Sequence, residues 1–167
     1  KDFVTKLLAA NEAKQNKTFA IIARVEALIS GIGMKQALKR ADAYEKAGAD
    51  LILIHSKKIT PEEIFEFSDS WKGSTPLVVI PTTYYSVNID ELIKHKIKMV
   101  IYANQTLRAA HFALSKLLKQ MASADNMSQF QNQMSSMDDI FKLQDMYAMK
   151  SQEKSIEEKL RKLGYIS

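Results

Sequence analysis

The amino-acid sequence predicts an α/β protein in which parallel strands alternate with helices. Apolar runs recur along the chain and are typical of strands that are covered on both faces. Between them lie segments whose apolar residues repeat at helical spacing, joined by short links with glycine, proline or capping residues. This alternation predicts right-handed crossovers, in either an open doubly wound sheet or a β/α barrel.

The first segments predict a helix, a strand and a second helix. Apolar residues of Asp2–Ala13 fall near one helical face, and residues 19–23 include no polar side chain. In residues 34–47, alanine, leucine and tyrosine recur at helical spacing. Gly48 follows directly, at the position where a residue in the left-handed conformation ends many helices.

The next strand and helix are expected on either side of a short polar link. Residues 51–55 form a second apolar strand. We expect Thr60 to be the N-cap of the following helix, with Pro61 at the first helical position and Glu63 at the third. This helix is expected to end near Trp71.

The same cycle then repeats. Strands are expected over residues 76–81 and 98–103, which are apolar for most of their length. A short helix over about 88–96 separates them, and a long helix over Gln105–Met121 follows. The chain is therefore expected to contain four strands, each followed by a helix.

The last part of the chain has a different composition. Residues 122–133 are rich in Ser, Asn, Gln, Asp and Met and predict a loop or hinge. A final helix is expected from about Met137, capped by Ser136 with Asp139 three positions on. Its apolar stripe must cover a surface, either of its own chain or of a neighbour. We therefore divide the chain into four βα units after an initial helix (1–121), a linker (122–136) and a C-terminal helical segment (137–167).

Composition excludes several classes of protein. The 167 residues are 46% hydrophobic and 26% charged, which suits one domain or part of a larger one. The absence of cysteine excludes disulfides, a cysteine nucleophile and thiolate metal ligands. The net charge of +5 is spread among acidic residues, so we expect no nucleic-acid partner. No apolar run approaches the roughly 20 residues of a membrane-spanning helix, so no membrane association and a cytoplasmic location are expected.

Polar residues follow the predicted strands at the edge where parallel α/β folds bind ligands. Arg24 and Glu26 follow the first strand, His55 and Ser56 the second, and Thr82 the third. A guanidinium at this edge suits a carboxylate or phosphate, although an ion pair with Glu26 is the alternative. His55 can donate to a phosphoryl oxygen or transfer a proton, or else serve as a capping or core histidine.

Two other kinds of site are not predicted. Gly31 and Gly33 are not followed by a third glycine at the spacing of a dinucleotide-binding motif. The strand ends also show no group of Asp, Glu and His residues that could ligate a metal.

A series of specific motifs occurs in order along the chain. They are ARVEA with G-x-G close behind, ALKRADAYEKAGAD, HSKK, VVIPTTYY, MVIYANQTLRAA and, near the C-terminus, DDIFKLQ. Together they resemble the phosphoenolpyruvate mutase family, within the isocitrate lyase and phosphoenolpyruvate mutase superfamily, from about residue 3 to 143. The isocitrate and methylisocitrate lyases share the arginine strand but are less similar around it.

The resemblance implies a modified (β/α)8 TIM barrel, of which this sequence supplies the C-terminal half. It also implies a C-terminal helix swapped onto a partner subunit, in a homodimer or homotetramer. The missing N-terminal half of the barrel is then a partner of this chain, because it is expected to supply the Mg²⁺ ligands. The sequence starts at Lys1 without a targeting pattern, and we expect it to begin inside a longer protein.

The implied activity is the isomerisation of phosphoenolpyruvate to phosphonopyruvate, which forms the carbon–phosphorus bond of phosphonates. Arg24 and His55 match the family's arginine and histidine that hold the phosphoryl group, so they are the expected catalytic and substrate-binding residues. Glu26, Ser56 and Thr82 are expected to support them, with Glu26 orienting the arginine.

Other functions stay open at this point. Phosphonopyruvate hydrolase uses a similar barrel to send the phosphoryl group to water, and its distinguishing gating loop lies outside this sequence. A carbon–carbon lyase of the same superfamily is a further enzyme alternative. The chain could also be an inactive fragment or an assembly subunit. By itself it is expected neither to bind Mg²⁺ nor to turn over substrate.

Overall fold

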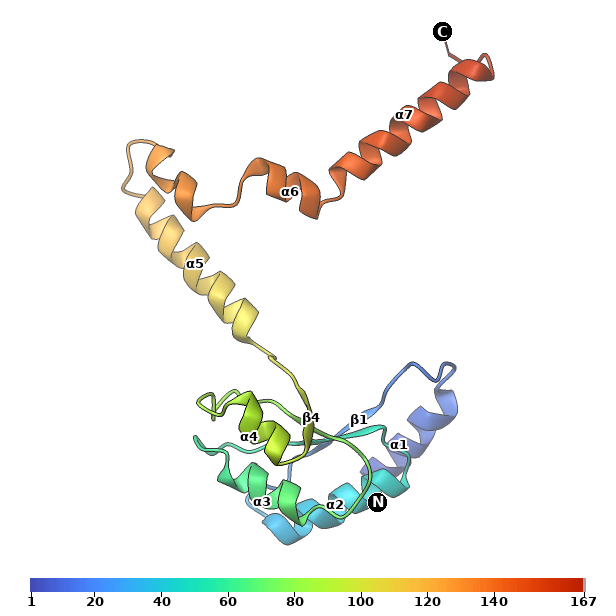
Figure 1. Ribbon diagram of the computed structural model, residues 1–167, viewed down its shortest axis with the longest axis vertical. Helices are drawn as coiled ribbons and strands as arrows, with labels where there is room; N and C mark the ends of the chain where they lie inside the picture. The colour runs from blue at the N-terminus through green and yellow to red at the C-terminus, as the bar shows by residue number, and fades with distance from the viewer. Residues whose placement is uncertain (167) are drawn as a thin grey trace. The chain divides into compact units, whose positions relative to one another are not determined.

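A parallel sheet organises the first part of the chain (Figure 1). Its four strands lie in the order β1-β2-β3-β4, so that each strand neighbours the next one along the chain. The strands are β1 (Ile22–Val25), β2 (Leu51–Ile54), β3 (Leu77–Val79) and β4 (Ile97–Val100). The predicted α/β class with parallel strands is confirmed. The order within the described residues lacks the reversal that marks a doubly wound sheet.

The computed structural model describes residues 1–166, which form two compact units. Lys1–Leu107 contains the sheet, and Arg108–Ser167 contains most of the long helix and everything after it. The helices of the first unit are α1 (Asp2–Ala13), α2 (Met34–Lys46), α3 (Glu62–Ser70) and α4 (Ile89–Lys94). The remaining elements are α5 (Gln105–Met121), the 3₁₀ helix η1 (Ser128–Gln133), α6 (Met137–Leu143) and α7 (Met146–Lys162).

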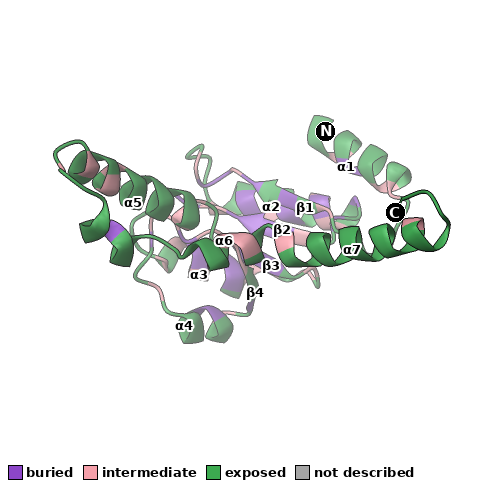
Figure 2. Cartoon of the chain, turned by 90° about the horizontal axis from the view of Figure 1, so that it is seen from above, coloured by how far each residue is buried: buried purple, intermediate pink, exposed green. Residues whose placement is uncertain are grey.

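The core of the first unit lies between one face of the sheet and the helices. Alternate strand residues, including Ala23, Val25 and Ile54, are buried together with Ile64 and Phe67 of α3. Figure 1 shows α2 and α3 on the same side of the sheet, and Figure 2 shows buried residues gathered on β1, β2 and α2. Burial of these apolar side chains is the main stabilisation of the unit.

The first strand differs from its prediction in position and in burial. It starts at Ile22, whereas Phe19 lies outside it with 64% of its surface exposed. Ile22 and Arg24 are exposed and alternate with buried Ala23 and Val25. The prediction of a strand over 19–23, covered on both faces, was wrong. A strand covered by helices on only one face can carry an arginine on the other.

Helix ends mostly follow the predicted signals. Gly48 has a φ of 86° directly after Ala47, the C-cap of α2, and is in the left-handed conformation as predicted. At α4 the side chains of Asn88 and Glu91 form a capping box. The predicted Thr60 cap of α3 was wrong, because the N-cap is Pro61 and no side chain caps the helix. Glu63, the expected third helical residue, is the second and turns its carboxylate to Ser56.

In the second unit the predicted final helix is divided in two. Ser136 caps α6 by accepting from the backbone N–H of Asp139, as predicted. The helix then stops, since Asp145 adopts a left-handed φ of 55°, and α7 begins. The expected loop over 122–133 contains η1 and the buried Phe130. No helix among residues 1–166 is long and apolar enough to cross a membrane.

Asn11 connects α1 to the end of α2. Its amide nitrogen donates to the carbonyl oxygens of Leu7, Ala47 and Gly48, at 3.0, 3.1 and 3.0 Å. A Cβ atom added to Gly48 would lie 2.9 Å from this nitrogen. The turn after α2 therefore needs glycine for two reasons, the backbone conformation and the close approach of Asn11.

This junction generates a stability prediction. Gly48→Ala should lower the free energy of unfolding of the native protein by more than the about 1–2 kcal/mol that a left-handed alanine costs. Gly31→Ala is the matched control, because Gly31 also has a positive φ of 70° but open space around its Cβ position. Urea denaturation of both variants checks this. Equal losses would show that the Asn11 contact contributes nothing.

Candidate functional site

Parallel pairing of β1 and β2 brings three predicted site residues to one edge of the sheet. Arg24 is the third residue of β1 and pairs with Leu53, and Val25 pairs with Ile54. His55 follows β2 directly. Because side chains alternate along a strand, Arg24, Glu26 and His55 are expected on the face opposite the main core.

The three side chains are in contact, and we call them the Arg24 cluster. Arg24 Nη2 lies 2.5 Å from Nδ1 of His55. Arg24 Nε forms an ion pair with Oε1 of Glu26, and this oxygen is 3.7 Å from His55 Nδ1. Both sequence-based alternatives for Arg24, an anion site and an ion pair with Glu26, are therefore compatible with this arrangement.

The contact with Arg24 defines the hydrogen-bonding state of His55. A guanidinium group can only donate, so Nδ1 of His55 accepts and the ring is neutral. Its proton is then on Nε2, which becomes the donor of the ring. Burial, together with the positive charge of Arg24, lowers the pKa of His55 below 6.5, while Glu26 acts in the opposite direction. The ring is thus a neutral donor near pH 7.

The Arg24–Glu26 ion pair is accessible to solvent. The two side chains are 46% and 40% exposed, and exposed ion pairs contribute only about 0–1 kcal/mol. An anion that reached Arg24 would therefore lose little by competing with Glu26. The His55 side chain is less exposed, at 20%.

Ser56 and Thr82 lie beside the cluster but not in it. Ser56 is fully buried, donates its hydroxyl to Glu63 Oε2 and accepts from the backbone N–H of Lys58 at 3.1 Å. Thr82 accepts from Asn104 Nδ2 at 3.5 Å. Among the described residues, neither side chain forms a hydrogen bond with the side chain of Arg24 or His55. Sequence reasoning missed the link to Glu63, because a serine and a glutamate seven residues apart form no recognisable motif.

The two tyrosines after β3 have different environments. Tyr84 is fully buried in the core, whereas Tyr85 is 83% exposed. Burial raises the pKa of Tyr84 to about 12, so its hydroxyl is protonated at neutral pH. Asn104 Oδ1 is buried without a hydrogen-bond partner within residues 1–166.

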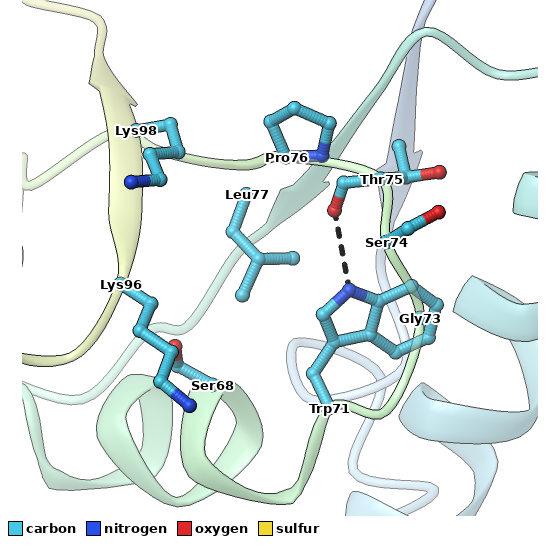
Figure 3. Close-up of a pocket in the computed structure, with 9 residues that line it drawn as sticks. All are labelled: Ser68, Trp71, Gly73, Ser74, Thr75, Pro76, Leu77, Lys96 and Lys98. Carbon is cyan, nitrogen blue, oxygen red and sulfur yellow. Dashed lines mark hydrogen bonds between the residues drawn. The ribbon is translucent and has the colours of Figure 1, made fainter.

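A separate pocket of about 240 Å³ lies at the other end of β3 and β4 (Figure 3). Trp71, Leu77, Lys96 and Lys98 contribute to its lining, and the indole N–H of Trp71 donates to the carbonyl oxygen of Thr75 at 3.2 Å. It includes no member of the Arg24 cluster. In the described part of the chain, no group of three or more His, Cys, Asp or Glu residues could hold a metal ion.

The fold and the cluster define an α/β protein with an arginine–histidine pair at the carboxyl edge of a parallel sheet. The sequence profile of the family described as phosphoenolpyruvate phosphomutase matches residues 1–122. The chain belongs to this family, as the motifs predicted.

Individual relatives agree with this membership. The phosphoenolpyruvate phosphomutase of Tetrahymena pyriformis is 37% identical over 153 residues, which are 92% of this chain and 51% of the relative. The crystal structure of the phosphoenolpyruvate phosphomutase from Streptomyces platensis subsp. rosaceus has a TM-score of 0.88 at 36% identity, covering 92% of this chain and 53% of that one. A phosphonopyruvate hydrolase in complex with oxalate and Mg²⁺ has a TM-score of 0.85 at 39% identity, over 89% and 53%. The chain thus spans about half the length of the relatives it matches.

The charges in the Arg24 cluster predict that two variants shift the pKa of His55 in opposite directions. Arg24→Gln should raise the pKa of His55, because a neighbouring positive charge disfavours the imidazolium. Glu26→Gln should lower it, because the carboxylate favours the imidazolium. NMR titration of the His55 ring protons measures both. Shifts in the same direction would contradict the geometry of the cluster.

Proposed function

We propose that this chain is part of a phosphoenolpyruvate mutase, which interconverts phosphoenolpyruvate and 3-phosphonopyruvate for the biosynthesis of phosphonates. Membership of the family supports this function. The observation that carries it is the contact between Arg24 and His55, which gives one edge of the sheet two adjacent donors for an anion.

The reaction moves a phosphoryl group within one molecule. The bond from phosphorus to the enol oxygen breaks and a bond from phosphorus to carbon forms, so that no atom is gained or lost. The migrating group is anionic and needs fixed donors that stabilise its charge while water is excluded. In this proposal Arg24 and Nε2–H of His55 hold the phosphoryl oxygens. Glu26 holds Nε of Arg24 and so orients the guanidinium.

We also propose that the sheet is half of a (β/α)8 barrel. The sequential strand order and the helices on one face support this architecture. Leu53 and Val78 are buried although they lie outside the main core cluster, as expected for residues that face a barrel interior.

For the C-terminal segment we propose exchange with a partner subunit in a homodimer or homotetramer. In α5 the apolar side chains of Leu107, Phe112, Leu114 and Leu118 are between 58% and 73% exposed. None of the described residues of α5, α6 or α7 is buried. Such surfaces are typical of helices that pack against another chain.

Mg²⁺ is the proposed cofactor, since the related hydrolase has been solved with oxalate and Mg²⁺. Residues 1–166 do not contain a group of ligands that fits it. The ligands are therefore proposed to come from outside the described residues.

Phosphonopyruvate hydrolase is the second candidate. The hydrolase structure is 39% identical to this chain and the mutase structure 36%, so identity does not separate the two activities. The arginine–histidine pair would suit either, because both activities bind the phosphonate group of phosphonopyruvate.

The product distinguishes the two candidates. Phosphonopyruvate supplied to the native protein should give phosphoenolpyruvate and no inorganic phosphate, as followed by phosphorus NMR. The carbon–phosphorus resonance should be replaced by that of a phosphate ester. Formation of inorganic phosphate as the first product would identify the hydrolase instead.

The role of Arg24 can be tested by substitution. Arg24→Ala should reduce kcat/KM by about 10²–10³-fold, which is about 3–4 kcal/mol and is typical of losing one preorganised donor. Arg40→Ala is the matched control, because Arg40 is an exposed arginine on α2 outside the cluster and its loss should leave the rate unchanged. A wild-type rate in Arg24→Ala would refute the proposed site.

A further inference from the structure

Glu63 lies at the start of α3, seven residues beyond Ser56, and its carboxylate is directed to the site edge rather than to its own helix. We propose that Glu63 is a positioning residue for His55, acting through Ser56. The inference depends on the proposed function only for the claim that His55 contacts the substrate.

Ser56 is held at three points. Its hydroxyl donates to Glu63 Oε2 and accepts from the backbone N–H of Lys58 at 3.1 Å. Its carbonyl oxygen accepts from the hydroxyl of Thr83 at 3.5 Å. Of these groups, the Glu63 carboxylate is the one that accepts the hydrogen bond donated by the Ser56 hydroxyl. Ser56 is fully buried, so removing Glu63 would leave this hydroxyl without its acceptor.

His55 lies between two anchored residues. On one side Ile54 is paired with Val25 in the sheet, and on the other side Ser56 is fixed by Glu63. The backbone of His55 is therefore held from both sides, with Nδ1 of its ring 2.5 Å from Arg24 Nη2. Release of Ser56 would free one of these two anchors. A small displacement of a catalytic group lowers the rate strongly, by about 100-fold for 1 Å.

The neighbouring Glu62 shows that position at the helix start does not explain the role of Glu63. Both residues are acidic and in the first turn of α3, where a negative charge is favourable. Glu62 is exposed and hydrogen-bonds to Thr60. Glu63 is half-buried and bonds to Ser56. A substitution at Glu62 therefore removes the helix-end charge without touching the His55 turn.

The test compares Glu63→Ala, Glu63→Gln and Glu62→Ala in the native protein. Two quantities are measured: the tautomer of His55, by ¹⁵N NMR of the ring nitrogens, and kcat/KM for phosphonopyruvate. In Glu63→Ala we expect a mixture of tautomers instead of the fixed Nε2–H form, and a fall in kcat/KM of about 10–100-fold. Glutamine keeps an oxygen acceptor for Ser56, so Glu63→Gln should restore both the Nε2–H tautomer of His55 and the wild-type kcat/KM. Glu62→Ala should change neither.

Three results would overturn the inference. The first is a fixed Nε2–H tautomer and an unchanged rate in Glu63→Ala, even if its melting temperature falls, which would make Glu63 merely structural. The second is a fall in kcat/KM in Glu63→Gln that is as large as the fall in Glu63→Ala. The third is a fall in kcat/KM in Glu62→Ala that equals the fall in Glu63→Ala. The tautomer is measured without substrate, so it tests the positioning of His55 even if the proposed activity proves wrong.

Discussion

The hydrogen bond from Arg24 to His55 is the interaction on which the site depends. It joins the ends of two neighbouring parallel strands, and it exists because Arg24 pairs with Leu53, two residues before His55. The donor character of the guanidinium keeps the ring neutral and places its proton on Nε2. Two donors for an anion thus stand side by side without a second positive charge on the histidine. Glu26 completes the group by holding the other side of Arg24.

The sheet makes this arrangement possible by having two different faces. One face packs on α2 and α3 and contains the main core. The other face carries Arg24, which pairs with buried Leu53 of β2, and Leu53 in turn pairs with buried Val78 of β3. A polar residue in the middle of a strand is costly when both faces are covered by apolar groups. It is inexpensive here, because Arg24 lies near the carboxyl end of β1, where its side chain is 46% exposed. Arg24, the first charged residue after the apolar run, is therefore part of the strand, whereas Glu26 follows it.

Much of the fold could be predicted from the sequence, because strand and helix periodicity and glycine positions are local signals. Asp2–Ala13, Gln105–Met121 and the left-handed Gly48 were predicted correctly. The start of β1 was not predicted correctly, because a run of apolar residues does not show which face of the strand is covered. The proximity of Arg24 and His55 could be predicted, because both residues lie at the carboxyl ends of neighbouring parallel strands. The contact of Ser56 with Glu63 could not be predicted, since it depends on how a turn and a helix start approach one another.

The central claim is that Arg24 and His55 together bind the phosphoryl group. The most direct test is a crystal structure of the native protein with phosphonopyruvate. We predict phosphonate oxygens at hydrogen-bond distance, about 2.7–3.2 Å, from the Arg24 guanidinium and from Nε2 of His55. A phosphonate bound elsewhere, for example beside Lys96 and Lys98 at the other end of β3 and β4, would contradict the claim.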